Sequence, residues 1–456
     1  MTGEKTARGS TLPPARERIL EWIQVACLAW IVWLPVSMGI VLYPALLLVA
    51  ATSLLLVLWR RTRPTRAAVA VWGVYYLWAV TWTAVSAARG NEGVWHQAAL
   101  WLGLPLLWGT WSLSLRAGQV RRTIIVLLGV GSLAGLVMLL LALQGVTGSP
   151  ALPTWLVELQ DMRVVVSGTG EIEQNYLGLS SLVGVATFAV AAAVLPSRDT
   201  WLPHRAVLAL AAAVMFAASS VSGRRGLLLV VLLVLATALL VGAVIVLARH
   251  RTPQQVGTYA AGAAVTLAAV AVFATTALGT NIATLAGLQP ATPPDPASSS
   301  SASSAEELDA LNQLQAESDQ LRSAQFTELI DAWREQPLVG HGFGATLDSD
   351  FTRSDERPWM FEAEPLQALM NVGVLGLLVA AGPVVLLLRR SWQALATGRH
   401  TRSVIAGLAT LFAVVLASAT NPYLQAPGHG WMLFVAAGIT GAVLHERPAA
   451  SPDDTH

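Results

Sequence analysis

Long apolar stretches recur along almost the whole chain, and short polar segments separate them. A helix that crosses a bilayer needs about 20 mostly apolar residues. Pro35 and Gly39 mark either a turn between the first two stretches or a kink within one helix. By length the pattern predicts about twelve membrane-spanning helices: Trp22–Met38, Ile40–Trp59, Ala67–Ala87, Val94–Leu113, Thr123–Gln144, Tyr176–Leu195, Ala206–Ser219, Gly226–Leu247, Tyr259–Leu278, Leu366–Leu388, Val404–Ala419 and Gly430–Leu444.

One long polar interruption, Gln289–Glu364, breaks this pattern. It divides the chain into an N-terminal bundle (1–288, about nine helices), a large loop (289–364), and a C-terminal bundle (365–456, about three helices and a tail). The loop starts with the Pro- and Ser-rich tract Pro290–Ser304, a composition typical of linkers. Its end carries aromatic residues, glycines and carboxylates. Long loops in compact domains are functional or disordered, so we expect the chemistry at this end.

Composition places the chain among polytopic membrane proteins. The 456 residues are 54% hydrophobic and only 12% charged, with a mean hydropathy of +0.58, whereas soluble domains carry about 25% charged residues. The net charge of +1 gives no indication of a nucleic-acid partner. The single cysteine, Cys27, excludes an internal disulfide and a cysteine-based metal site.

Basic residues in the short loops predict the orientation of the bundle. By the positive-inside rule they mark the cytoplasmic side, together with both termini. The long loop, the Gly145–Gln174 and Asn421–His429 segments and the Ser222–Arg225 turn then face the periplasm or exterior. The clusters that carry this signal are Arg60–Arg66, Arg116–Arg122, Arg198–Arg205, Arg249–Arg251 and Arg389–Arg402.

Arg224 and Arg225 oppose that orientation, because they fall at an outer helix mouth. Basic residues there need a reason, since their desolvation is costly. An anionic ligand is one reason. Snorkelling of the side chains to outer-leaflet headgroups is the alternative.

Several motifs on the expected outer face resemble those of one family. Two of them close the long loop: Pro337–Gly344, with glycines at 340, 342 and 344, and Glu362–Gly376 at the start of a helix. The others are Ser222–Leu228, Asn175–Gly178, Asn421–Leu424 and the basic residue Arg322. In their order along the chain, over roughly Asn175 to Leu424, these motifs resemble those of the O-antigen ligase and O-antigen polymerase superfamily.

That resemblance implies an all-α, membrane-embedded glycosyltransferase of the GT-C-like type in the bacterial cytoplasmic membrane, with its active site outside. The implied activity transfers glycan from an undecaprenyl-diphosphate carrier to a glycan or lipid-linked acceptor. Neither a metal nor another cofactor is expected, and other polysaccharide assembly proteins are possible partners. Ligases that act on lipid A core have His at the position of Glu362, so the glutamate favours a polymerase or exopolysaccharide enzyme.

The expected chemistry needs a base for the acceptor hydroxyl and cations for the diphosphate leaving group. Glu362 is the preferred base, and His341 and Glu364 are its rivals. Arg225, Arg224 and Arg322 are the expected diphosphate ligands, because guanidinium groups bind phosphate in a bidentate fashion. Further substrate-binding candidates are Arg163, Asn175 and Asn421.

Each candidate also has an ordinary structural interpretation. Glu362 and Glu364 could cap the following helix, and Asn175 could cap its own. His341 could be a solvated turn residue, and its flanking glycines would permit positive φ. Arg163 could be an ordinary surface residue.

Two other function classes compete with the transferase. One is a flippase or other transporter of lipid-linked glycan, and the other is a non-catalytic scaffold of envelope assembly. A transporter is expected to bury ionisable residues in mid-membrane. The predicted spans contain few of them, which favours the enzyme.

Overall fold

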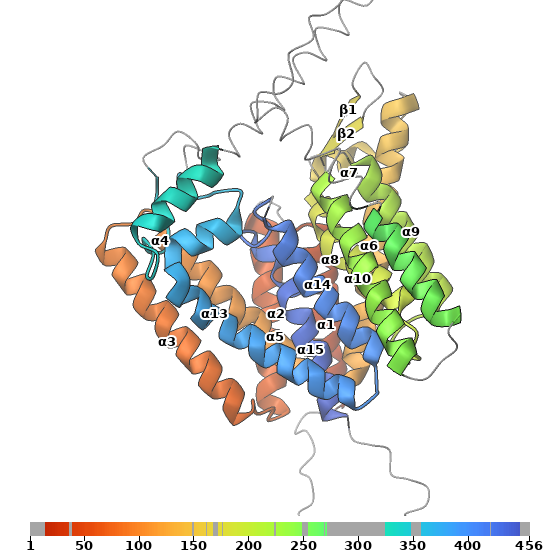
Figure 1. Ribbon diagram of the computed structural model, residues 1–456, viewed down its shortest axis with the longest axis horizontal. Helices are drawn as coiled ribbons and strands as arrows, with labels where there is room; N and C mark the ends of the chain where they lie inside the picture. The colour runs from red at the N-terminus through yellow and green to blue at the C-terminus, as the bar shows by residue number, and fades with distance from the viewer. Residues whose placement is uncertain are drawn as a thin grey trace, which may run out of the picture.

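The protein is an almost entirely helical bundle (Figure 1). The computed structural model describes residues 14–35, 39–147, 150–160, 162–166, 172–175, 177–222, 225–248, 254–268, 270, 324–347, 357–419 and 421–446. The helices are α1 (Pro14–Trp33), α2 (Gly39–Trp59), α3 (Arg66–Ala88), α4 (Val94–Ala98), α5 (Leu104–Ser114), α6 (Ala117–Thr147), α7 (Thr154–Leu159), α8 (Leu182–Val194), α9 (Arg205–Val221), α10 (Arg225–Ala248), α13 (Glu364–Ala396), α14 (Thr401–Ala417) and α15 (Trp431–His445). Residues 254–268 and 324–335 are also helical.

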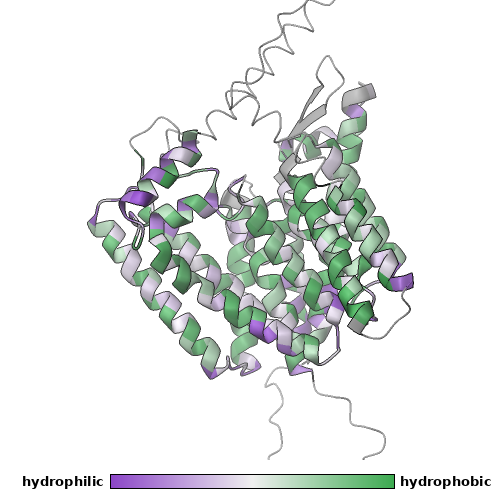
Figure 2. Ribbon diagram, viewed as in Figure 1, coloured by the Kyte–Doolittle hydropathy of each residue, from purple (hydrophilic) through white to green (hydrophobic). Residues whose placement is uncertain are grey.

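Six helices within the described part of the chain are long and apolar enough to cross a membrane. They contain the segments Leu42–Trp59, Arg66–Ala88, Ala117–Gln144, Leu227–Leu247, Glu364–Ala396 and Pro427–His445. Three further apolar helices are shorter: Gly178–Val194, Arg205–Val221 and Thr401–Ala417. The chain is therefore a helical membrane protein, and Figure 2 shows apolar residues along the helices with polar residues at their ends.

Most of the predicted helices coincide with described helices, but within the described residues six are long enough to span a membrane, compared with about twelve predicted, and several boundaries differ. Between the first two, α1 ends at Trp33 and α2 begins at Gly39. The Pro290–Ser304 tract and the latter half of the predicted Tyr259–Leu278 helix lie outside the described residues. The predicted Tyr176–Leu195 helix starts later, because the 3-10 turn Leu177–Ser181 precedes α8.

Asn175 does not begin that helix. It is the last residue of β2 (Ile172–Asn175), which pairs antiparallel with β1 (Arg163–Val166). In this register Arg163 lies opposite Asn175. A short hairpin thus brings two of the candidate residues together.

The predicted Val94–Leu113 helix contains a π-helical turn, η1 (Ala99–Gly103), between α4 and α5. The Leu104 amide bonds the carbonyl of Ala99, five residues back. The carbonyl of Trp101 accepts the Tyr75 hydroxyl from α3 at 2.7 Å. Four residues later stands Pro105, which has no N–H to donate to this carbonyl within the helix. The π-turn also places the Trp101 ring against Phe343.

The core is centred on α8, where every residue from Leu182 to Ala192 is buried. Its Ala-rich sequence permits close packing against α9, α10 and α14. Figure 1 shows α6, α8, α9 and α10 at one side of the bundle, and α3, α4, α13 and the 324–335 helix at the other. The candidate site belongs to this second side.

Candidate functional site

Helix α13 is broken in its N-terminal third. Gly373 has φ 61° and ψ −173°, a conformation open essentially only to glycine. A break inside a membrane helix exposes backbone groups that must find other partners within the protein. The partners come from the Pro337–Gly344 motif.

Backbone hydrogen bonds join this motif to both sides of the break. The His341 and Gly342 amides donate to the carbonyls of Met370 and Asn371, each at 2.9 Å. Beyond the break, the Val374 and Leu375 amides donate to the carbonyls of Pro337 and Leu338, at 3.0 and 3.1 Å. The motif therefore completes a transmembrane helix that cannot satisfy itself.

The three glycines of the motif permit this approach. Gly340, Gly342 and Gly344 all have positive φ, at 70°, 100° and 69°, which confirms the predicted turns. The space around these glycines also leaves no room for a larger side chain. A Cβ at Gly340 would lie 2.5 Å from the Met370 carbonyl oxygen, and one at Gly344 would lie 2.0 Å from the backbone of Gly93.

Phe343 anchors the motif in the membrane domain. Its side chain is fully buried, stacks on Trp101 with a ring-centroid distance of 5.4 Å, and meets Trp78 edge-on. The Ser86 hydroxyl accepts the Phe343 amide at 2.7 Å. The Asn91 side chain donates to the carbonyls of His341 and Phe343. The end of α3 and the following turn thus fix the loop.

His341 is held by the 324–335 helix. Its Nε2 lies 2.6 Å from the carbonyl oxygen of Ala332, and because a carbonyl only accepts, Nε2 carries the proton. Glu335 lies 3.9 Å from the same nitrogen. In this tautomer only Nδ1 has a lone pair, so a base role for His341 would have to use that nitrogen.

The two candidate glutamates have different surroundings. Glu362 is half-buried, and its backbone amide donates to the Gln325 side chain at 2.7 Å. The Glu364 side chain is buried in the first turn of α13, where its carboxylate accepts the backbone amides of Leu424 and Gln425 at 2.9 and 2.7 Å. The N-cap residue of α13 is Ala363, which makes no side-chain capping bond. Through its two long-range bonds Glu364 secures the turn between α14 and α15.

A buried amide cluster surrounds Glu364. The Gln425 amide nitrogen donates to the Phe361 carbonyl and to the Gln367 side chain, at 3.0 and 2.8 Å. Gln367 in turn donates to the Trp359 carbonyl at 2.7 Å. Among the described residues, the side-chain oxygens of Asn371 and Gln425 are buried without a hydrogen-bond partner. Buried acceptors of this kind suit a ligand that offers hydroxyl or N–H groups.

This cluster lies at one end of an elongated apolar groove of about 740 Å³ between α3, α5, α13 and α15. Along α13 the lining runs from Glu364 to Arg390. At 1.5 Å per residue this is roughly 40 Å of helix, which exceeds the ~30 Å hydrocarbon core of a bilayer. Trp72, Tyr75 and Phe434 form part of its aromatic wall. Glu364, Gln367, Asn371 and Gln425 all line its polar end.

The structure describes only some of the other residues that were predicted to bind substrate. Arg224 and Arg322 lie outside the described residues, and the structure describes only the backbone of Arg225, the first residue of α10. Asn421 begins the turn after α14, and its carbonyl accepts the Tyr423 amide at 2.7 Å. This is the turn that Glu364 secures. No group of three or more potential metal ligands occurs among the described His, Cys, Asp and Glu residues.

Four residues of this region were not among those predicted from the sequence: Gln367, Asn371, Gln425 and Asn91. A signal was present for two of them, because Gln367 and Asn371 are polar residues four apart in an apolar segment. Polar side chains in such positions face the protein interior or a cavity. Gln425 and Asn91 lie in turns and gave no comparable signal.

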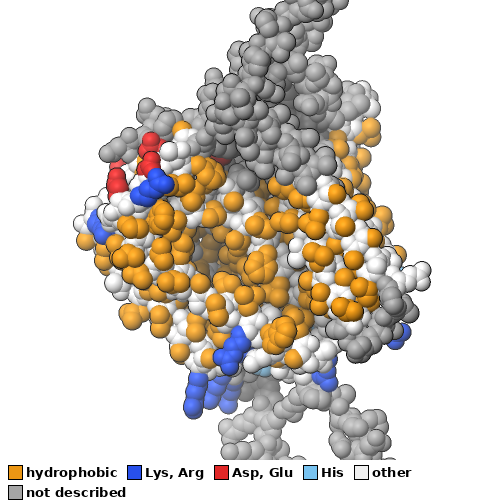
Figure 3. All heavy atoms as spheres, viewed as in Figure 1, with side chains coloured by type: hydrophobic (Ala, Val, Ile, Leu, Met, Phe, Trp, Pro, Cys, Tyr) orange, Lys and Arg blue, Asp and Glu red, His pale blue; other side chains and the backbone are white. Residues whose placement is uncertain are grey.

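The charges of the described surface are asymmetric. In Figure 3 basic side chains without acidic neighbours gather along the lower edge, whereas acidic and basic side chains lie together at the upper left, near the 324–335 helix. Comparison with models of known protein families and with curated protein sequences finds no match. The function must therefore be inferred from the residues and geometry of this chain.

Proposed function

We propose that the protein transfers glycan from an undecaprenyl-diphosphate carrier to a glycan or lipid-linked acceptor at the outer face of the bacterial cytoplasmic membrane. The supporting observation is the groove: an apolar path along most of α13, from Arg390 to Glu364, that ends at a buried carboxylate and amide cluster. A polyprenyl chain requires an apolar path within the bilayer, and a sugar requires hydrogen-bonding groups beside it.

The polar end fits a hydroxyl-rich group better than a diphosphate. Its described side chains include the Glu364 carboxylate and the unpartnered amide oxygens of Asn371 and Gln425, all of which repel anions. We therefore assign sugar hydroxyls to this end. The diphosphate is assigned to Arg224, Arg225 and Arg322, as the sequence motifs imply.

Glu362 remains the proposed general base. It follows the fully buried Phe361 and precedes the buried Ala363, so its backbone position is well fixed at the start of α13. Glu364 is less suited to this role, because both of its carboxylate oxygens already accept backbone amides. Proton removal by a positioned base contributes about 10²–10⁴-fold in rate.

The test compares Glu362→Gln with Glu364→Gln. The first variant should lose about 10²–10⁴-fold in transfer rate and keep its melting temperature. The second should be less stable by about 2 kcal/mol, because a hydrogen bond to a charged group contributes about 1.5–3 kcal/mol. Turnover is measured with lipid-linked glycan in detergent, and stability by thermal unfolding. Wild-type turnover of Glu362→Gln would remove this residue from the mechanism.

The groove also supports a second candidate, a transporter of lipid-linked glycan. Its lining includes Arg63 and Arg390 at the end opposite Glu364, so polar groups occur at both ends of the apolar path. Purified protein in vesicles separates the two functions. A transferase extends or transfers glycan in detergent without any bilayer, whereas a transporter only moves labelled carrier between leaflets.

The surface glycan of a deletion strain distinguishes the two kinds of transferase. A polymerase defect should leave single repeat units on the acceptor. A ligase defect should leave complete polymer on its carrier. Wild-type glycan in the deletion strain would contradict both.

A further inference from the structure

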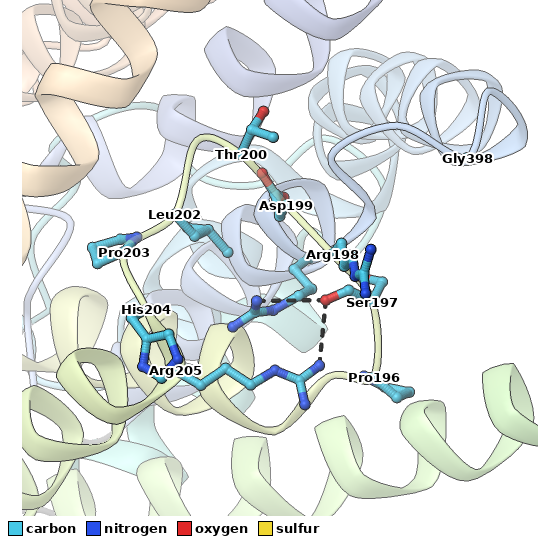
Figure 4. Close-up of a pocket in the computed structure, with 11 residues that line it drawn as sticks. Pro196, Ser197, Arg198, Asp199, Thr200, Leu202, Pro203, His204, Arg205 and Gly398 are labelled. Atoms are coloured by element: carbon cyan, nitrogen blue, oxygen red, sulfur yellow. Dashed lines mark hydrogen bonds between the residues drawn. The ribbon is translucent and has the colours of Figure 1, made fainter.

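A second cavity, of about 1170 Å³, lies at the opposite end of the bundle from Glu364, between the α8–α9 loop and the start of α14. Its lining includes the basic residues Arg198, Arg205 and Arg402. Figure 4 shows Arg205 pointing toward Ser197, with Arg198 and His204 on either side of the loop. This cavity takes no part in the proposed transfer reaction.

Two of the arginines converge on one backbone carbonyl. Arg205 donates to the carbonyl of Ser197 at 3.3 Å, and Arg402 donates to the same oxygen at 3.5 Å. Arg402 also bonds the Ala192 carbonyl, and Arg205 the Leu195 carbonyl. These acceptors belong to the end of α8, where partial negative charge favours cations. Carbonyl dipoles, however, do not neutralise two adjacent guanidinium groups.

The nearby carboxylate is already engaged elsewhere. The side chain of Asp199 is fully buried and bonds His400, the Ser403 amide and the Ser403 hydroxyl, at 2.9, 2.9 and 2.8 Å. Among the described residues, no carboxylate forms an ion pair with Arg198, Arg205 or Arg402. Asp199 itself lines the cavity and its negative charge acts on Arg402, but one carboxylate cannot balance three arginines, so the cavity keeps an excess of positive charge.

A further observation points to a ligand. Ser197 is 8% exposed and lines the cavity, and its hydroxyl oxygen is buried without a hydrogen-bond partner among the described residues. A hydroxyl beside converging guanidinium groups is a combination that hydrogen-bonds a phosphate oxygen. Leu202 and Pro203 add an apolar side to the same cavity.

The helices around the cavity are short for a bilayer. α9 and α14 have 17 residues each, or roughly 25 Å at 1.5 Å per residue, compared with a hydrocarbon core of ~30 Å. Short helices draw the headgroup region toward their ends. In a bilayer adapted to these helices, a cavity at their ends would lie near the lipid phosphates, and basic pockets between helices suit anionic headgroups.

We propose that this cavity binds the phosphate headgroup of an anionic phospholipid. The lipid phosphate would engage Arg198, Arg205 and the Ser197 hydroxyl, while Leu202 and Pro203 contact the adjoining glycerol and acyl region. A bound lipid would thereby hold the α8–α9 loop against the start of α14. This site is independent of the transferase proposal.

The test is native mass spectrometry of delipidated protein in detergent with added phosphatidylglycerol. Phosphatidylcholine, which also carries a phosphate but has no net charge, serves as the comparison lipid. Because one basic residue near an anionic membrane surface contributes about a fivefold change in affinity, Arg198→Gln and Arg205→Gln should each weaken phosphatidylglycerol binding about fivefold. Ser197→Ala should weaken it less. Arg389→Gln is the matched control, since this exposed arginine lies away from the cavity.

Arg198→Gln keeps the test valid if Arg205→Gln fails to fold, because Arg198 is exposed and forms no ion pair within the described part of the chain. Equal phosphatidylglycerol binding by wild type, Arg198→Gln and Ser197→Ala would overturn the proposal. So would equally tight binding of phosphatidylcholine. Binding of inorganic phosphate is measured as well. If phosphate binds and phosphatidylglycerol does not, the cavity is a site for a free anion and the lipid assignment is wrong.

Discussion

Helices α8 and α13 are both mostly apolar but have opposite structural roles. α8 is regular and buried over its length, and its small residues pack directly against neighbouring helices. In α13 only 22% of the most apolar membrane-spanning window is buried, and the helix breaks at Gly373. A glycine in α8 admits a neighbouring side chain, whereas the glycine in α13 admits a loop that replaces lost helical bonds. The second arrangement creates a polar site within an apolar layer.

The largest test of this contrast replaces the glycine in each helix. Gly373→Ala should destabilise the protein by roughly 4 kcal/mol, combining backbone strain of about 1–3 kcal/mol with overpacking of about 1–3 kcal/mol. Its Cβ would lie 2.4 Å from the Leu338 carbonyl oxygen. Thermal unfolding in detergent measures the change.

Gly184→Ala in α8 is the matched control. Its Cβ would meet the flexible Met432 side chain at 2.6 Å, so the neighbour can move. We expect a loss of about 1–2 kcal/mol, at the lower end of overpacking costs. Equal losses in the two variants would mean that the break in α13 is not structurally required.

A somewhat smaller effect is expected for the anchor of the loop. Phe343→Ala should cost about 3 kcal/mol, since truncation of a buried phenylalanine typically costs 3–5 kcal/mol and some of the cavity can close. Transfer activity should fall with it, because the loop supports the helix segment that carries Gln367 and Asn371. Phe412→Ala on α14 is the control, since Phe412 is 48% exposed. Full turnover by Phe343→Ala would show that transfer activity does not depend on the anchoring of this loop.

The smallest expected effect is the pH dependence of stability that comes from the Asp199–His400 pair, which joins the α8–α9 loop to the start of α14. Burial lowers the pKa of His400, but the Asp199 and Glu446 carboxylates more than offset this, so its pKa is raised above 6.5. Burial raises the pKa of Asp199, yet the hydrogen bonds from His400 and Ser403 bring it below 3.8. Stability from His400 is present below pH 6.5 and is lost as pH rises through its raised pKa. Stability from Asp199 is present above pH 3.8 and is lost as pH falls through its lowered pKa.

The Asp199–His400 pair should therefore contribute most to stability between about pH 4 and pH 6.5. The melting temperature of wild type should fall toward pH 8, and that of His400→Gln should fall less. The break in α13 should respond little, because backbone groups that do not titrate complete it. An identical pH dependence of the two proteins would exclude the pair as its cause.

The sequence located most of the helices, because a run of apolar residues long enough to cross a bilayer has few alternatives to a helix. It did not settle how many of them span the membrane, since six of the described helices are long and apolar enough. It also indicated the positive φ of the three motif glycines, because glycine adopts left-handed backbone conformations without a steric penalty. It could not indicate the β1–β2 hairpin, because Arg163–Val166 is a short apolar run that fits several local structures. The roles of Glu362 and the predicted arginines remain predictions.

Tertiary structure alone decided which polar groups meet. Arg60, a topology signal in the sequence, is buried against Glu17 and Glu21 of α1. Glu364, expected as a helix cap, secures a turn that lies 60 residues later in the chain. Local periodicity fixes which residues are helical and which face is apolar, because these depend on near neighbours in the sequence. The break in α13, its loop partner and the buried amide cluster depend on contacts between distant segments, which no local pattern encodes.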